Sequence, residues 1–202
     1  MPITTIVFDL GGVLIDWNPR YLYRKIFATE AQVDHFIENI CTMAWNEQQD
    51  AGRTWAEANE VLIAQHPAYQ SEIEAYFGRW PEMLGGAIGE TVKILEHFHQ
   101  SKTYRLYALT NWSAETFPVA KKRFAFLKYF EDILVSGEVK LKKPDQRIYQ
   151  LLFERFDIIP EEAIFIDDSA KNIKAAAEVG MQVIHFQDGP SLSASLRKMA
   201  VL

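Results

Sequence analysis

Acidic side chains directly follow two short apolar segments of this 202-residue chain. Asp9 follows residues 4–8, and the pair Asp167 and Asp168 follows residues 163–166. Two adjacent carboxylates repel each other unless a positive charge lies close to them. Oxygen ligands from Asp9 and Asp168 would suit a hard cation such as Mg²⁺. The pattern therefore predicts a cation site, although Asp9 taken alone could equally end a strand in an ordinary turn.

Other polar groups stand at comparable points of the chain. Thr110 and Asn111 add a hydroxyl and an amide after another apolar segment. Three lysines, Lys140, Lys142 and Lys143, precede Pro144, and one of them could neutralise the acids. A solvated loop is the plainer interpretation of Lys140 and Lys142.

The elements that must position these groups are predicted to be strands of one parallel sheet. Five β-like segments are rich in β-branched and aromatic residues: 4–10, 104–110, 133–136, 163–166 and 182–186. Helix-like segments between the later strands have apolar residues at three- and four-residue steps: 114–126, 145–156 and 170–179. This alternation predicts an α/β fold with a Rossmann-like parallel sheet, which binds ligands at the carboxyl edge of its strands.

A long helical segment interrupts this alternation after the first strand. Its helix-like parts are 20–28, 30–43, 54–65 and 71–79, and residues 90–100 then return to the sheet as a crossover helix. We therefore predict a small helical cap domain over residues 18–84, inserted into a core domain of residues 1–17 and 85–202. Gly85 and Gly86 are the candidate hinge.

Composition limits the class of protein. The 21 Lys and Arg against 27 Asp and Glu give a net charge of −6, which argues against nucleic acid as the main partner. With 49% hydrophobic residues the chain can bury a core, which excludes intrinsic disorder. No apolar segment is long enough to span a membrane, no signal peptide is visible, and the single cysteine fits a reducing compartment. We expect a cytoplasmic monomer or homodimer that acts on a small molecule.

Four motifs in order resemble the haloacid dehalogenase-like (HAD) hydrolase superfamily. They are Asp9-Leu10-Gly11-Gly12-Val13, Thr110-Asn111, Lys143-Pro144-Asp145 and Asp167-Asp168-Ser169-Ala170-Lys171-Asn172. The resemblance covers the whole predicted core domain, and the helical insertion resembles the cap of many members. The Asp-Leu-Gly form of the first motif is similar to a phosphatase branch that includes an enzyme acting on sugar 1-phosphates.

The resemblance implies a role for each motif. Asp9 would be the nucleophile that forms an aspartyl-enzyme intermediate. Mg²⁺ would be held by Asp9, the carbonyl of Gly11 and Asp168, with Asp167 nearby. Lys143 would balance the charge of a phosphorylated substrate and Thr110 would donate to it. The implied phosphate- and substrate-binding residues of these loops are Leu10, Gly11, Thr110, Asn111, Lys143 and Asn172.

Gly11 departs from most phosphatases of the superfamily, which carry a second aspartate there as general acid and base. A leaving group that needs little help, such as the anomeric alcohol of a sugar 1-phosphate, would explain the glycine. A metal-independent 2-haloacid dehalogenase would also explain the glycine, but Asp167 and Asp168 argue against this alternative. A non-catalytic phospho-ligand-binding protein has no need for the complete motif set. We therefore expect a Mg²⁺-dependent phosphomonoester hydrolase acting on a small phosphorylated metabolite, with a sugar phosphate as one candidate.

Substrate specificity is expected to come from the insertion. Residues 45–47 and 50–53 resemble the turn by which small caps reach an active site. Trp45 and Arg53 are the candidate substrate contacts there, the first for a sugar face and the second for an anion. Trp17 is a further aromatic candidate. Packing inside the cap is the plainer alternative for both tryptophans, and a solvated surface for Arg53.

Overall fold

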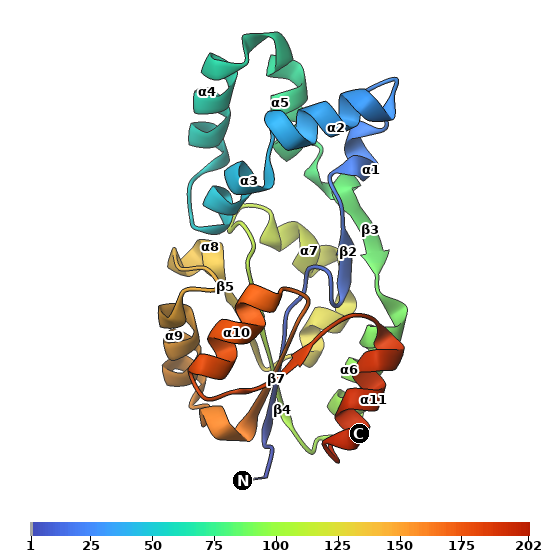
Figure 1. The fold of residues 1–202 in the computed structure, drawn as a ribbon, viewed down its shortest axis with the longest axis vertical. Helices are drawn as coiled ribbons and strands as arrows, with labels where there is room; N and C mark the ends of the chain where they lie inside the picture. Colours follow the sequence, from blue (N-terminus) through green and yellow to red (C-terminus); the bar gives the residue numbers. More distant parts are fainter. Residues whose placement is uncertain (1) are drawn as a thin grey trace.

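Five parallel strands form the central sheet of the computed structural model, which describes residues 2–202 (Figure 1). The strand order is β5-β4-β1-β6-β7. The bounds are β1 Thr5–Phe8, β4 Arg105–Thr110, β5 Asp132–Val135, β6 Ala163–Asp167 and β7 Gln182–His185. The predicted α/β class with a parallel sheet is confirmed, and the five strands fall within one or two residues of the predicted segments.

Helices cover both faces of this sheet because its central strands carry apolar side chains on both faces. Along β1, Ile6 and Phe8 belong to one hydrophobic cluster while Val7 belongs to the other, as the two-residue period of a strand requires. Helices α6 (Gly89–Ser101), α7 (Phe117–Arg123) and α11 (Gly189–Lys198) contribute to the first cluster. Helices α9 (Gln146–Phe156) and α10 (Ala170–Glu178) contribute to the second.

Five helices at the upper end of Figure 1 come from the stretch of chain between strands β1 and β4. They are α1 Arg20–Tyr23, α2 Glu30–Asn39, α3 Met43–Asp50, α4 Trp55–Gln65 and α5 Gln70–Gly78. We refer to residues 18–84, which contain them, as the cap. The hydroxyls of Thr29 and Thr54 accept backbone N–H groups at the starts of α2 and α4, and both helices have complete capping boxes.

The prediction of one helix over 30–43, followed by a turn at 45–47, is wrong. Helix α2 ends at Asn39, and a separate helix, α3, begins at Met43. The cause is Thr42, whose hydroxyl accepts the backbone N–H of Trp45 and so caps a new helix. The predicted turn at 45–47 is therefore helical, and the chain turns only at residues 51–53.

A two-stranded antiparallel ribbon, which the sequence patterns did not predict, connects the cap to the sheet. It pairs β2 (Ile15–Trp17) with β3 (Leu84–Ala87), and both proposed domain boundaries lie in it, since Trp17 pairs with Leu84. A Cβ atom at Gly85 would lie 2.1 Å from Oδ2 of Asp16, so a larger residue there would displace the Asp16 side chain. The predicted hinge glycines are thus part of a strand.

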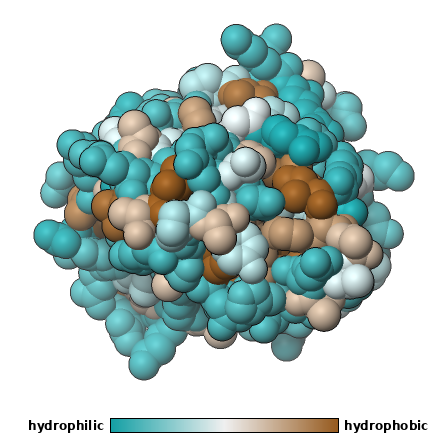
Figure 2. Space-filling model, turned by 90° about the horizontal axis from the view of Figure 1, so that it is seen from above, coloured by the Kyte–Doolittle hydropathy of each residue, from teal (hydrophilic) through white to brown (hydrophobic). Residues whose placement is uncertain are grey.

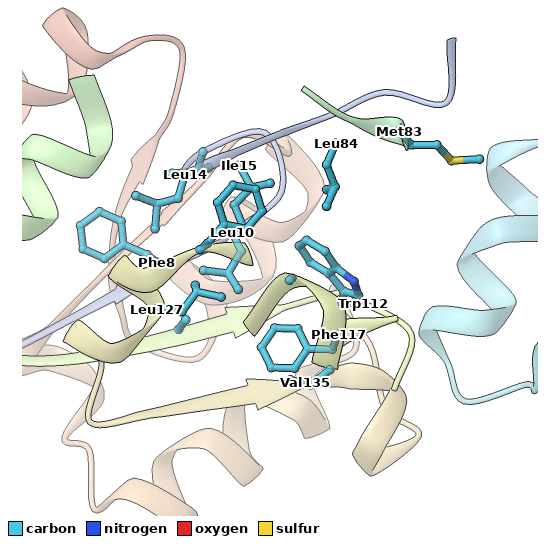
Figure 3. Close-up of a cluster of buried hydrophobic side chains, with 14 of the residues drawn as sticks. Phe8, Leu10, Leu14, Ile15, Met83, Leu84, Trp112, Phe117, Leu127 and Val135 are labelled. Atoms are coloured by element: carbon cyan, nitrogen blue, oxygen red, sulfur yellow. The ribbon is translucent and has the colours of Figure 1, made fainter. Parts of the chain in front are cut away.

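Side chains of the ribbon continue the hydrophobic core of the sheet. Ile15 and Leu84 belong to the same hydrophobic cluster as Leu10 and Trp112, which follow β1 and β4 (Figure 3). This packing fixes the base of the cap against the strand ends. The outer surface of the cap is mainly hydrophilic, with hydrophobic residues in small groups (Figure 2).

Short elements complete the structure: η1 Pro67–Tyr69, η2 Trp80–Met83, η3 Ala125–Tyr129, α8 Ser136–Val139 and η4 Pro160–Glu162. The helix predicted over 114–126 is shorter than expected. Helix α7 spans Phe117–Arg123, and the short helix η3 follows it. Within residues 2–202, no helix has the length and apolar character that a membrane span needs.

Candidate active site

One buried lysine joins two of the predicted acids at the carboxyl edge of the sheet. Nζ of Lys143 lies 2.9 Å from Oδ1 of Asp9 and 2.7 Å from Oδ2 of Asp167, and it also donates to the carbonyl of Leu109. Lys143 is fully buried. Burial opposes its charge, but the two carboxylates outweigh that effect and raise the pKa of Lys143 above its ordinary value.

Asn111 holds the backbone of this lysine. Its Nδ2 donates to the carbonyl of Lys143 over 3.0 Å, and its Oδ1 accepts the Lys143 N–H over 2.8 Å. The end of β4 is therefore tied to the loop before α9. Asn111 also lines the cavity described below, so it can both position Lys143 and contact a ligand.

Asp167 is a positioning group whose two oxygens are already engaged. It is fully buried and accepts from Lys143, from the backbone N–H of Ser169 and from Nδ2 of Asn172, which lies 3.1 Å from both oxygens. Asn172 thus touches Asp167 from helix α10 and also lines the cavity. The implied contact of Asn172 with a substrate stays a prediction.

Asp168 faces the cavity from the same turn. A Cβ atom at Gly12 would lie 2.3 Å from Oδ2 of Asp168, and Gly12 has a φ of +75°. Glycine is therefore required at position 12 both for the backbone conformation and for the close approach of Asp168.

The acidic cluster fits a divalent cation. Asp9, Asp167 and Asp168 each offer an oxygen within 4.8 Å of the others. Three carboxylates face one lysine, so the charge of Lys143 does not balance the cluster. Burial, together with the neighbouring acids, raises the pKa of Asp9 even though Lys143 opposes the shift, and burial likewise raises the pKa of Asp168. Hard oxygen donors with excess negative charge are the set that Mg²⁺ prefers.

Asp9 is oriented by its own loop. Its Oδ1 accepts the backbone N–H of Leu10 over 2.7 Å as well as the Lys143 ammonium, which leaves Oδ2 as the less engaged oxygen. The side chain of Leu10 is buried in the core. The hydroxyl of Thr110 is buried and, among residues 2–202, has no hydrogen-bond partner. Thr110 ends β4, the strand next to β1, but it is not among the residues that line the cavity described below. Its predicted hydrogen bond to a ligand oxygen stays a prediction.

Gly11 borders open space. No atom lies within 4 Å of the position that a Cβ would take there, and Gly11 lines the cavity. A side chain would therefore fit at this position. Steric crowding does not explain why the chain lacks a second carboxylate beside Asp9.

A cavity of about 290 Å³ lies between the strand ends and the cap. From the core, Asp9, Gly11, Asn111, Ser113 and Asp168 are among the residues that line it. From the cap it is lined by Met43, Asn46, Glu47, Asp50, Trp55 and Trp80, and Trp17 lines it from the end of β2. With Trp112, four of the five tryptophans of the chain line the cavity, so its wall is largely aromatic.

Polar contacts hold the cap against the core. Glu47 accepts from Lys142 over 2.6 Å and from Lys171 over 3.3 Å. The indole of Trp55 donates to the hydroxyl of Ser113 over 3.1 Å, and its backbone N–H donates to Glu115 over 2.8 Å. The interpretation of Lys142 as a solvated loop residue is therefore wrong.

The structure places Trp45 and Arg53 within the cap, and neither lines the cavity. Trp45 packs edge-on against Trp55 and Tyr76, with ring centroids 5.5 Å and 5.1 Å away. Arg53 donates to Oε1 of Gln49 and to the carbonyl of Trp45. The expectation that Trp45 and Arg53 face the substrate is thus corrected in favour of packing inside the cap.

Four residues of α3 line the cavity: Met43, Asn46, Glu47 and Asp50. The sequence pointed to segments 45–47 and 50–53, but not to these side chains within them. Their spacing of three, four and seven residues is that of one helix face, which was the available signal. Trp55 and Trp80 carried no comparable signal, because their placement depends on how the cap packs.

Comparisons with known proteins agree with this site. A family model described as haloacid dehalogenase-like hydrolase matches residues 3–180. The chain is 28% identical to the sesquiterpene phosphatase astK of Aspergillus oryzae, over 96% of this chain and 94% of that protein. It is 27% identical to a phosphorylated carbohydrates phosphatase of Thermotoga maritima, over 93% of this chain and 88% of that protein.

A solved structure with the same fold contains ligands of the expected kind. The HAD family enzyme bt-2542 of Bacteroides thetaiotaomicron, in complex with magnesium and inorganic phosphate, is 27% identical. The match covers 93% of this chain and 96% of that chain, with a TM-score of 0.69. A dehalogenase structure at 20% identity and a TM-score of 0.68 shares the fold.

Proposed function

Because this chain belongs to the haloacid dehalogenase-like hydrolase family, we propose that it is a Mg²⁺-dependent phosphomonoester hydrolase acting through an aspartyl-phosphate intermediate on Asp9. The observation that carries the proposal is the oriented Asp9 carboxylate, held by Lys143 and Leu10 at the floor of a cavity. The phosphatase names of two relatives that match nearly the whole chain support it.

In this mechanism Oδ2 of Asp9 attacks the phosphorus atom and the alcohol leaves. Lys143 and the hydroxyl of Thr110 stabilise the charge on the phosphoryl oxygens. A bound Mg²⁺, held by Asp9, the carbonyl of Gly11 and Asp168, would screen the repulsion between carboxylate and phosphate. Asp167 and Asn111 fix Lys143 in place. Water then hydrolyses the aspartyl phosphate.

The substrate we propose is a small phosphorylated metabolite whose organic part is neutral, with a sugar phosphate as the first candidate. Aromatic rings can cover the apolar face of a sugar, while Asn46 and Ser113 offer polar contacts. Among the described residues lining the cavity, Lys171 is the one cation, and it pairs with Glu47. A second anionic group on the substrate would therefore find little to pair with.

The test is a substrate panel with Mg²⁺ and with EDTA: p-nitrophenyl phosphate, glucose 1-phosphate, glucose 6-phosphate, farnesyl phosphate and phosphoglycolate. We expect metal-dependent phosphate release, faster for neutral organic groups than for phosphoglycolate. Metal-independent halide release from L-2-chloropropionate, without phosphate release, would instead establish a dehalogenase. Tight phosphate binding with no turnover of any ester would establish a binding protein.

A further inference from the structure

The proposed hydrolysis needs a proton donor for the leaving group, and the loop of Asp9 does not provide one. Gly11 has no side chain, although the space above it is open. We propose that Asp50, on cap helix α3, is the general acid that protonates the leaving oxygen and the general base that then activates water. This inference rests on the proposed phosphatase function and extends it to a residue outside the core.

Asp50 is the carboxylate that remains when the other acids of the cavity are assigned. The acids that line it are Asp9, Glu47, Asp50 and Asp168. Asp9 is the nucleophile and Asp168 belongs to the cation cluster. Glu47 is bound by Lys142 and Lys171, and the hydrogen bond from Lys142 lowers its pKa, so it stays ionised. Within residues 2–202, Asp50 forms no salt bridge.

The position of Asp50 is set by the core rather than by the cap alone. The backbone N–H of Ser113, in the loop after β4, opposes the rise in the pKa of Asp50, and Nδ2 of Asn46 donates to Oδ2 of Asp50 over 3.5 Å. Ser113 also accepts the indole N–H of Trp55, so the same loop contacts the start of α4. The same loop begins after Thr110, the predicted phosphate ligand. The docked cap thus brings Asp50 to the wall of the cavity whose floor holds Asp9.

The surroundings of Asp50 suit proton exchange near neutral pH. Burial raises its pKa to about 7, and the charge of Glu47 on the same helix adds to the shift. Lys142, the Ser113 N–H and Lys143 oppose it. A carboxyl group with a pKa near the working pH can hold a proton and later accept one.

Both steps balance with this one group. In the first, Oδ2 of Asp9 bonds to phosphorus, the ester P–O bond breaks, and the Asp50 proton moves to the leaving oxygen, which departs as an alcohol. In the second, Asp50 takes a proton from water as the water oxygen bonds to phosphorus. The bond between phosphorus and Asp9 breaks, which releases inorganic phosphate and restores both carboxyl groups.

The decisive variant is Asp50→Asn, since it keeps the size of the side chain and its amide oxygen can still accept Nδ2 of Asn46. The matched control is Asp157→Asn, an exposed residue whose backbone already has the left-handed conformation that asparagine tolerates. Rapid-mixing assays would compare p-nitrophenyl phosphate, whose leaving group needs no proton, with an alkyl phosphate, whose leaving group does. Steady-state assays from pH 5 to 9 would complete the set.

For Asp50→Asn we expect a burst of p-nitrophenol close to that of the wild type, followed by turnover slowed about 100-fold or more. On the alkyl phosphate we expect no burst, and the rate should no longer depend on a group titrating near pH 7. The same bursts, rates and pH profile in Asp50→Asn and Asp157→Asn would overturn the assignment. So would a raised KM with an unchanged kcat, which would indicate a purely structural role.

Loss of the fold is checked separately. Asp50→Asn should keep the wild-type circular dichroism, and Mg²⁺ with inorganic phosphate should still raise its melting temperature. If Asp50→Asn is unstable, Asp50→Ser provides the same test with a smaller side chain. A wild-type protein that releases no phosphate from any ester would refute the proposed function itself, a result distinct from an active wild type with an equally active Asp50→Asn.

Discussion

The carboxylate of Glu47 lies 2.6 Å from the ammonium of Lys142 and so joins the cap to the loop before α9. The next residue in that loop, Lys143, turns the other way and contacts Asp9 and Asp167. Neighbouring lysines therefore serve two purposes, one holding the cap down and the other neutralising the site below it. Cap docking and the geometry of the proposed nucleophile are linked through one short segment.

Lys142→Met should loosen the docked cap and raise KM. The pair is partly exposed, with side chains 28% and 33% accessible, so a coupling of about 0.5–1 kcal/mol is expected, or a KM two- to fivefold higher. A double-mutant cycle on KM with Glu47→Gln measures that coupling. Lys128→Met, an exposed lysine without a salt bridge among the described residues, is the control. Additive effects in the cycle would show that the ion pair contributes nothing to closure.

Asp9→Asn should abolish turnover while leaving the fold intact. The amide oxygen can still accept the Leu10 N–H, but an amide cannot form the phosphoryl ester, so kcat should fall by about 10⁴ or more. Phosphate release and circular dichroism measure the two parts of this prediction. A fully active Asp9→Asn protein would remove Asp9 from the nucleophile role.

Mg²⁺ should stabilise the protein through Asp168. A cation that binds the folded state at 100 times its dissociation constant adds about 2.7 kcal/mol to the free energy of unfolding. We therefore expect Mg²⁺ to raise the melting temperature of the wild type but not of Asp168→Ala, and EDTA to remove the effect. The control is Asp188→Ala, which removes a helix-capping acid outside the acidic cluster. An equal Mg²⁺ shift in Asp168→Ala and the wild type would place the cation elsewhere.

The raised pKa of Asp50 should make stability depend on pH. The carboxyl group binds its proton more tightly in the folded chain, about 7 against 3.8 when unfolded. The free energy of unfolding should therefore fall as the pH rises from about 4 to about 7, and this contribution should level off above that.

In Asp50→Asn, the free energy of unfolding should fall by about 2 kcal/mol less between low and neutral pH than it does in the wild type. This figure allows for the water that reaches this half-buried group. Urea unfolding at pH 5 and pH 7.5, without Mg²⁺, measures the difference. Asp157→Asn should keep the wild-type slope. An unchanged slope in Asp50→Asn would mean that the carboxyl group titrates as freely in the folded chain as in the unfolded one.

Much of the core could be predicted from local sequence patterns. Continuous apolar segments identify strands buried on both faces, and the polar residues that follow them must meet where parallel strands end. For this reason the sequence alone groups Asp9, Thr110, Asp167 and Asp168. The ribbon of β2 and β3 could not, since strands of three and four residues give too short a period to recognise.

The cap shows where such reasoning stops. Trp45 and Trp55 have the same chemistry and similar neighbours along the chain, yet one packs inside the cap and the other lines the cavity. Likewise, nothing local distinguishes Arg53 from Asp50 as a residue of the site. Thr42 caps α3 and so sets where that helix begins, and the ion pairs of Glu47 with Lys142 and Lys171 fix which face of α3 lies against the core.

The sequence by itself determined the sheet, the strand-end acids and the family, because these depend on periodicity and on residues within a few positions of each other. Only the tertiary structure decided that Lys142 binds the cap, which tryptophans line the cavity and which cap carboxylates share that cavity with Asp9. Those outcomes depend on packing between segments far apart in the chain, and the free energy of that packing leaves no local pattern in the sequence.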